Sequence, residues 1–103
     1  MELIKHPSPN YGLRRKNTEI EFIILHYTAM STEKSLKRLC DPVHEVSCHY
    51  VIDPSGICYQ LVDDRKRAWH AGKSYWRGYH DLNSRSLGVE LVTSGNEKYP
   101  EAQ

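Results

Sequence analysis

The feature that most constrains the fold is an apolar run at residues 20–25, which reads Ile-Glu-Phe-Ile-Ile-Leu. β-Branched and aromatic residues favour an extended strand, and apolar side chains at nearly every position are typical of a strand buried on both faces. The run ends at His26, where small and hydroxyl residues follow. We therefore expect a strand of an α/β sheet that is buried on both faces and has a histidine at its carboxyl end, where such sheets place binding groups.

A short amphipathic helix is expected after this strand. Ser31 and Thr32 are suitable N-cap residues, and Leu36 and Leu39 follow at helical spacing. The Asp-Pro pair at residues 41–42 then ends the element, because the residue before a proline disfavours helical backbone. The first half of the chain thus predicts a strand followed by one short helix.

Three further strands complete the expected pattern. Residues 47–53 and 57–62 have strand composition, and the Pro-Ser-Gly turn at 54–56 joins them as a hairpin. Residues 86–92, Ser-Leu-Gly-Val-Glu-Leu-Val, form the last strand. This order predicts a single α/β domain over residues 1–103, with a central mixed β-sheet and flanking helices.

Two segments have little regular pattern. Residues 1–18 are polar and contain Pro7, Pro9 and Gly12, which predicts an irregular N-terminal arm that wraps the core. Residues 63–81 mix charges, aromatics and glycines, a composition typical of a long functional loop.

Charge and composition argue against several classes of function. Lysine and arginine number 14 against 13 acidic residues, so no strong field favours nucleic acid, a membrane or an acidic partner. No stretch is apolar enough for a secretory leader or a membrane span, which predicts a cytoplasmic location. The three cysteines are odd in number and form no Cys-x-x-Cys pair, so we expect reduced, mostly buried thiols.

His26 is the first candidate for chemistry. A histidine at the end of a buried strand is well placed to bind a metal ion. Considered alone, however, a histidine at a strand end is more often an ordinary hydrogen-bonded side chain.

Glu90 is the second candidate, because it places a carboxylate inside an otherwise apolar strand, where an unpaired charge is costly. If it faced a metal-bound water, it could accept a proton from that water and return it to a leaving amine. The alternative interpretation is that Glu90 pairs with an arginine or points to solvent from an edge strand.

Aromatic and polar residues of the long loop and its flanks form a third group. They could stack on sugar rings or bind carboxylate and amide groups, and the tryptophans could equally fill a small core. The group consists of Trp69, Tyr75, Trp76, Arg77, Tyr79 and Asn83.

Taken together, the segments resemble one known family, the type 2 N-acetylmuramoyl-L-alanine amidases. This family includes AmpD-like enzymes, T7-type lysozymes and peptidoglycan recognition proteins. The resemblance covers essentially the whole chain and rests on an ordered set of segments: Pro-Ser-Pro-Asn-Tyr at 7–11, Ile-Leu-His-Tyr-Thr-Ala at 24–29, Ser-Cys-His-Tyr-Val-Ile-Asp at 47–53, Ala-Trp-His-Ala-Gly at 68–72, Tyr-Trp-Arg-Gly at 75–78, and Leu-Asn at 82–83 leading to Ser-Leu-Gly-Val-Glu at 86–90.

The resemblance implies a peptidoglycan-recognition-protein-like fold and hydrolysis of the amide between the lactyl group of N-acetylmuramic acid and L-alanine. It implies a Zn²⁺ cofactor with His26 as a metal ligand, and Glu90 as the catalytic acid/base. Tyr27, Trp69, His70 and Asn83 are implied to contact a substrate, which is peptidoglycan or a muropeptide.

The sequence departs from the family at its carboxyl end, where the family continues into a helix and a Gly-His-x-Asp segment with further zinc ligands. We therefore expect a truncated domain with its last helix missing and an incomplete zinc site, since a catalytic zinc usually needs three protein ligands. Three hypotheses follow: an amidase completed by a second polypeptide, a non-catalytic muropeptide-binding module, or an inactive remnant of a split gene.

Overall fold

The structure is a computed structural model that describes residues 2–16, 18–28, 30–70, 75–76, 79–80 and 82–93. Its centre is a mixed sheet of five strands. In spatial order these are β1 (Leu3–Lys5), β5 (Cys58–Gln60), β4 (Tyr50–Ile52), β9 (Ser86–Val92) and β3 (Phe22–Thr28). β9 runs parallel to both of its neighbours, and β4 and β5 form an antiparallel pair. The predicted α/β domain with a mixed sheet is confirmed.

Smaller elements surround this sheet. Two antiparallel pairs are formed by β2 (Tyr11–Leu13) with β6 (Lys66–Ala68) and by β7 (Tyr75–Trp76) with β8 (Tyr79–His80). The helical elements are α1 (Thr32–Leu39), the 3₁₀ helix η1 (Pro42–His44) and α2 (Leu82–Arg85). In the described part of the chain, no helix is long and apolar enough to cross a membrane.

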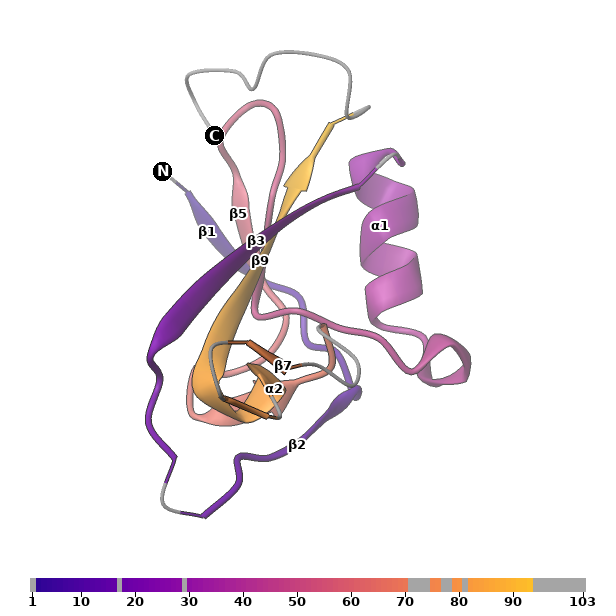
Figure 1. Ribbon diagram of the computed structural model, residues 1–103. Coiled ribbons are helices and arrows are strands. Elements are labelled where there is room, and N and C mark those ends of the chain that lie inside the picture. The colour runs from indigo at the N-terminus through magenta and orange to yellow at the C-terminus, as the bar shows by residue number, and fades with distance from the viewer. Residues whose placement is uncertain are drawn as a thin grey trace.

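Helix α1 forms where the sequence predicts it and lies beside one face of the sheet (Figure 1). The Ser31 hydroxyl accepts a hydrogen bond from the backbone N–H of Lys34 at 3.2 Å, which satisfies a free N–H of the first turn. Leu36 and Leu39 are buried in the core with Val51 of β4. The helix therefore covers one side of the sheet and leaves its charged residues at the surface.

The predicted hairpin is also confirmed. The Asp53 carboxylate accepts hydrogen bonds from the backbone N–H groups of Ser55 and Ile57, at 2.9 and 3.0 Å. Gly56 has a φ of 92°, a conformation that glycine adopts without strain. These contacts close the turn between β4 and β5.

The prediction that the first apolar run forms a strand buried on both faces is wrong. β3 is the last strand in the sheet order among the described residues. Ile23, Leu25 and Tyr27 are 67, 63 and 59% exposed, while the alternate positions face α1 and are partly or fully buried. Apolar composition alone could not reveal this, because it does not show whether a second layer covers the outer face.

The N-terminal arm, predicted to be irregular over residues 1–18, contributes the strands β1 and β2. Both are only three residues long, which is too short to produce a periodic pattern in the sequence. Between them, the buried Asn10 donates side-chain hydrogen bonds to the carbonyls of Asp41 and Val46, both at 2.9 Å. The arm thus satisfies backbone groups that follow helix α1.

The loop predicted over residues 63–81 likewise contains short strands, β6, β7 and β8, whose lengths of two or three residues again fall below the range of pattern analysis. Cys48 and Cys58 are buried and Cys40 is half-buried, and none of the three takes part in a disulfide in the described part of the chain.

His49 is fully buried just before β4 and joins several segments. The backbone N–H of Gly88 donates to its Nδ1 at 3.0 Å, so this atom carries no proton. The hydrogen of the neutral ring is therefore on Nε2, which donates to the carbonyl of Lys66 at 2.9 Å. Burial lowers the pKa of His49, the Lys66 carbonyl opposes this effect, and the nearby Arg14 adds to it.

We predict that replacing Asn10 with alanine lowers the free energy of unfolding by about 2 kcal/mol, because two partly buried carbonyls lose their donors. Urea denaturation measures this change. Asn10→Asp has the same shape but lacks the donors, and it should be at least as destabilising. Lys16→Ala, on the exposed part of the same arm, should change stability by less than about 0.5 kcal/mol; an equal loss there would contradict the prediction.

We predict that stability falls as the pH drops below about 6.5, the ordinary histidine pKa. The unfolded chain then binds a proton at His49, whereas the folded state resists it because its pKa is lowered. Urea denaturation at pH 7.5 and 5.5 should show a smaller difference for His49→Gln than for the wild type. His44→Gln removes an exposed histidine as a control, and the same reduction in both variants would refute the assignment.

Candidate active site

The register of two parallel strands brings the two main candidates together. His26 of β3 lies directly across from Glu90 of β9, and Val51 of β4 lies on the other side of Glu90. Both candidate side chains are half-buried. Side chains alternate along a strand, so residues paired in this way lie on the same face of the sheet. The sequence predicted the two residues, and the structure places them side by side.

Glu90 has no hydrogen bond or ion pair through its carboxylate within the described residues, so the pairing with arginine that the sequence allowed is not formed there. Burial raises the pKa of Glu90, while the nearby His26 and Arg38 act in the opposite direction. A half-buried carboxylate with a raised pKa can accept and return protons more readily than an exposed one near neutral pH.

Among the described residues, the side chain of His26 contacts another histidine, His70. Its Nε2 lies 3.1 Å from Nδ1 of His70, and Nε2 of His70 lies 2.9 Å from the hydroxyl oxygen of Ser86. Burial, followed by the charges of His26 and His49, lowers the pKa of His70 to about 3, so its ring is neutral at pH 7. A neutral imidazole carries one hydrogen, so His70 donates to one neighbour and accepts from the other.

Gly88 allows His70 to occupy this position. A Cβ atom added at Gly88 would lie 2.6 Å from both Cγ and Cδ2 of the His70 ring. No real Cβ contact is that short, so the imidazole can rest against β9 only because residue 88 has no side chain. A glycine inside a strand often marks such a close approach.

A half-buried arginine from the arm, Arg14, supports the same region. Nη1 of Arg14 donates to the backbone carbonyls of Asn83, Ser84 and Ser86 at 3.2, 3.0 and 3.0 Å. Its Nε and Nη2 both donate to the carbonyl of Asp64. This one guanidinium therefore fixes α2 and the start of β9 relative to the segment that leads into β6.

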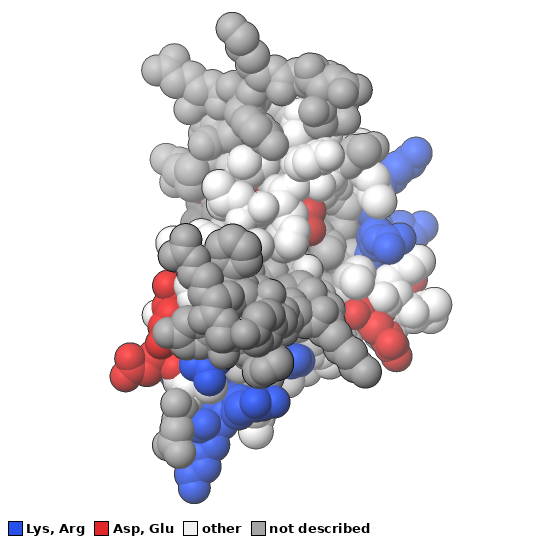
Figure 2. All heavy atoms as spheres, in the orientation of Figure 1, with Lys and Arg blue, Asp and Glu red and all other residues white. Residues whose placement is uncertain are grey.

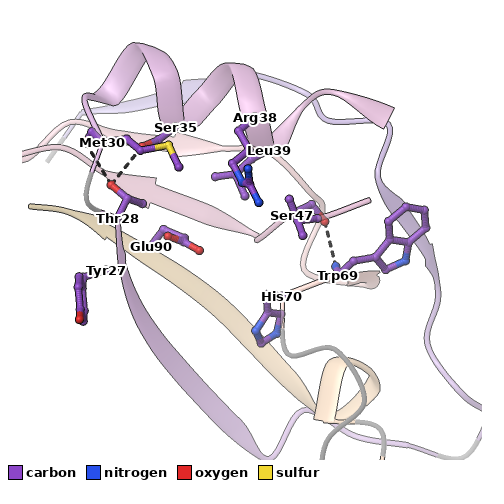
Figure 3. Close-up of a pocket in the computed structure, with 11 residues that line it drawn as sticks. Tyr27, Thr28, Met30, Ser35, Arg38, Leu39, Ser47, Trp69, His70 and Glu90 are labelled. Atoms are coloured by element: carbon purple, nitrogen blue, oxygen red, sulfur yellow. Dashed lines mark hydrogen bonds between the residues drawn. The ribbon is translucent and has the colours of Figure 1, made fainter. Parts of the chain in front are cut away.

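The remaining predicted site residues lie around the same pair. Asn83 is buried and its Oδ1 accepts a hydrogen bond from the backbone N–H of His70 at 3.1 Å. Trp69 is half-buried, and its backbone N–H donates to Ser47. Tyr27 borders the pocket, although its ring points to the side of β3 away from Glu90 (Figure 3). Their predicted substrate contacts stay predictions.

Glu90 and His70 border a pocket of about 280 Å³ between the sheet and α1. Ser35, Arg38 and Leu39 of α1 line its opposite wall, as Figure 3 shows. The carboxylate of Glu90 and the guanidinium of Arg38 thus border the same pocket, which is large enough for part of a small ligand.

A zinc site is not complete within residues 2–16, 18–28, 30–70, 75–76, 79–80 and 82–93. There, no group of three histidine, cysteine, aspartate or glutamate side chains is arranged to hold a metal ion. His26 is an available imidazole beside the pocket, but one ligand does not form a catalytic zinc site. The residues described so far therefore do not by themselves fit the metal.

Several residues of the site were not predicted from the sequence. Arg14 lies in a segment expected to be irregular, and His49 and Ser86 act through contacts that depend on the fold. Gly88 alone carried a usable signal, because a glycine in a strand interior indicates a close approach.

The chain resembles known proteins over nearly its whole length. Residues 16–103 match the family described as N-acetylmuramoyl-L-alanine amidase. N-acetylmuramoyl-L-alanine amidase AmiD of Escherichia coli K12 is 40% identical over 86 residues, which cover 77% of this chain and 30% of AmiD. The 1,6-anhydro-N-acetylmuramyl-L-alanine amidase AmpD of the same organism is 41% identical over 115 residues, covering 94% of this chain and 63% of AmpD.

Solved structures share the fold. A crystal structure of an AmpD derivative has a TM-score of 0.83 at 27% identity and covers 99% of this chain and 67% of that one. E. coli AmiD, in complex with the substrate anhydro-N-acetylmuramic acid-L-Ala-D-γ-Glu-L-Lys, has a TM-score of 0.69 at 31% identity, with coverage of 93% and 39%. The chain thus spans less than two thirds of the length of the two curated relatives. Because the family match covers most of the sequence and the fold is shared, the protein belongs to the N-acetylmuramoyl-L-alanine amidase family.

Proposed function

We propose that the chain provides the glutamate half of an amidase site that hydrolyses the bond between the lactyl group of N-acetylmuramic acid and L-alanine in muropeptides. The observation that carries the proposal is Glu90, whose carboxylate has no hydrogen-bond or ion-pair partner among the described residues and lies across from His26 beside a pocket. The activities named for AmiD and AmpD, and the muropeptide in the AmiD complex, support the substrate class.

The role proposed for Glu90 follows from the chemistry of amide hydrolysis. Water must lose a proton as it attacks the carbonyl carbon, and the leaving amine must gain one. A single carboxylate can perform both transfers if it lies beside the reacting atoms. Because burial raises the pKa of Glu90, its carboxylate form should appear at a higher pH than that of an ordinary glutamate, and the rate should rise with pH through that range.

Zinc stays a prediction, with His26 as one ligand, because the described residues do not complete a metal site. A bound zinc ion would polarise the carbonyl and activate water, and it would need two further protein ligands from outside the described residues. For His26 to offer the lone pair of Nδ1, its Nε2 must donate to His70, and His70 must then donate to Ser86. The contacts of 3.1 and 2.9 Å allow this direction of hydrogen bonding.

A second candidate function is a muropeptide-binding module without turnover. The incomplete set of ligands in the described residues favours it. The second polypeptide, the split-gene remnant and the cytoplasmic location stay predictions.

We predict that Glu90→Gln lowers amidase turnover of an anhydromuropeptide by at least about a hundredfold, because glutamine keeps the shape but cannot accept the proton. Muropeptide affinity should change by less than about threefold. Product release measured by chromatography, with zinc supplied and then chelated, tests this. Glu33→Gln, an exposed glutamate on α1, is the matched control.

Two other outcomes separate the candidates. Turnover that survives Glu90→Gln would exclude the proposed role of this residue. Tight muropeptide binding with no turnover, with or without zinc, would establish the binding module instead.

We predict that Gly88→Ala displaces the His70 ring and breaks its contact with His26, because the added methyl would lie 2.6 Å from the ring. Two-bond ¹H–¹⁵N spectra of the histidine rings should show a changed signal for His26. Gly12→Ala, where an added Cβ would lie 3.9 Å from Nε1 of Trp69, should leave the His26 signal unchanged. An unaltered spectrum in Gly88→Ala would contradict the proposed packing.

A further inference from the structure

Arg38 occupies an unusual position on α1. It belongs to the last turn of the helix, is exposed, and borders the same pocket as Glu90 (Figure 3). In the described part of the chain, no hydrogen bond or ion pair engages its guanidinium. Its positive charge acts on Glu90 and opposes the effect of burial. The guanidinium is therefore available to a ligand in the pocket.

A second hollow of about 200 Å³ adjoins this position. It shares Met30 and Arg38 with the pocket of Glu90, and Lys34 and Lys37 also line it. Figure 2 shows blue side chains on the side of the molecule where α1 lies, with acidic side chains below them; a larger group of blue side chains lies at the lower end of the molecule. Asp41 and His44, at the far end of the hollow, lie 3.9 Å apart and contact each other. Positive charge thus continues outward from the pocket along α1.

The helix itself does not account for this arrangement. Basic residues in the last turn of a helix interact favourably with its dipole, which explains Lys37 and Arg38 in part. However, Lys34 and Arg38 are four residues apart on the same face, where like charges repel. An anion bound between the two hollows would remove this repulsion.

The substrate class supplies such an anion, and this step rests on the proposed function. The ligand in the AmiD complex contains D-γ-Glu directly after L-Ala. A glutamate linked through its γ-carboxyl keeps its α-carboxylate free. That carboxylate lies about two residue lengths, roughly 7 Å, from the amide that Glu90 would act on.

We propose that Arg38 is a specificity residue that binds a free carboxylate on the peptide part of the substrate. A guanidinium can bind a carboxylate through two parallel N–H···O hydrogen bonds, whereas a carboxamide offers one acceptor and no charge. The site therefore prefers muropeptides with a free carboxylate next to L-alanine over those in which this group is amidated.

Two probes that differ only in this group test the proposal: N-acetylmuramyl-L-alanyl-D-γ-glutamyl-L-lysine and its amide, N-acetylmuramyl-L-alanyl-D-isoglutaminyl-L-lysine. In both, the γ-carboxyl is held in the peptide bond to lysine, as in the ligand of the AmiD complex. Their affinities are measured by calorimetry for the unmodified chain and, to prevent turnover, in the Glu90→Gln background. We expect the acid to bind about tenfold more tightly than the amide, because the free energy of a charge-assisted hydrogen bond corresponds to an affinity difference of about that size. Arg38→Gln should reduce this ratio to about one by weakening only the acid.

Two variants control for charge and folding. Arg38→Lys keeps the charge but not the paired donors, and it should retain part of the preference. Arg65→Gln removes an exposed arginine that pairs with Asp63 and lines neither hollow, so it should keep the full ratio. Thermal melts monitored by circular dichroism confirm that each variant is folded.

Three results would overturn the proposal: a preference that survives Arg38→Gln, equal weakening of both probes, or an equal effect of Arg65→Gln. Equal binding of both probes to the unmodified chain would also overturn it while leaving the proposed function intact. Failure of the unmodified chain to bind either probe at millimolar concentration would refute the proposed function as well.

Discussion

The parallel pairing of β3 with β9 is the constraint on which the candidate site depends. Seven residue pairs fix the register and place His26 opposite Glu90. Because side chains alternate along each strand, a slip of one residue would turn His26 to the exposed face and put Leu25 or Tyr27 opposite Glu90. The identity of the site therefore depends on register as much as on residue type.

The histidine and glutamate are held by a polar frame whose members are buried or half-buried. His70 rests on Gly88, whose backbone N–H is bonded to His49. Arg14 then ties the start of β9 to the N-terminal arm through backbone carbonyls. Each of these groups has partners, which is the condition under which buried polar networks stabilise a fold instead of weakening it. The short strands of the arm matter because they bring Arg14 into this frame.

The sequence predicted the parts of the structure that have a strong local signal. Helix α1 has an N-cap, leucines at helical spacing and an Asp-Pro stop, and β9 has the same bounds as the predicted strand 86–92. His26 and Glu90 became candidates because each departs from an apolar run, and the resemblance to the amidase family then implied their roles. Contacts between segments far apart in the chain left no such signal: Arg14 and His49 are 35 residues apart. The exposure of Ile23 could not be predicted either, because it depends on what lies over the outer face of the sheet.

The position of β3 at the end of the sheet order gives the two candidate residues unequal mechanical support. Glu90 lies on a strand bonded to neighbours on both sides, β3 and β4, whereas β3 has one paired neighbour among the described residues. An edge strand opens at a lower free-energy cost than a central one. The site thus has a stiff half that carries the carboxylate and a more compliant half that carries the imidazole. The side-chain contacts of His26 with His70 and of Thr28 with Ser35 of α1 restrain the compliant half.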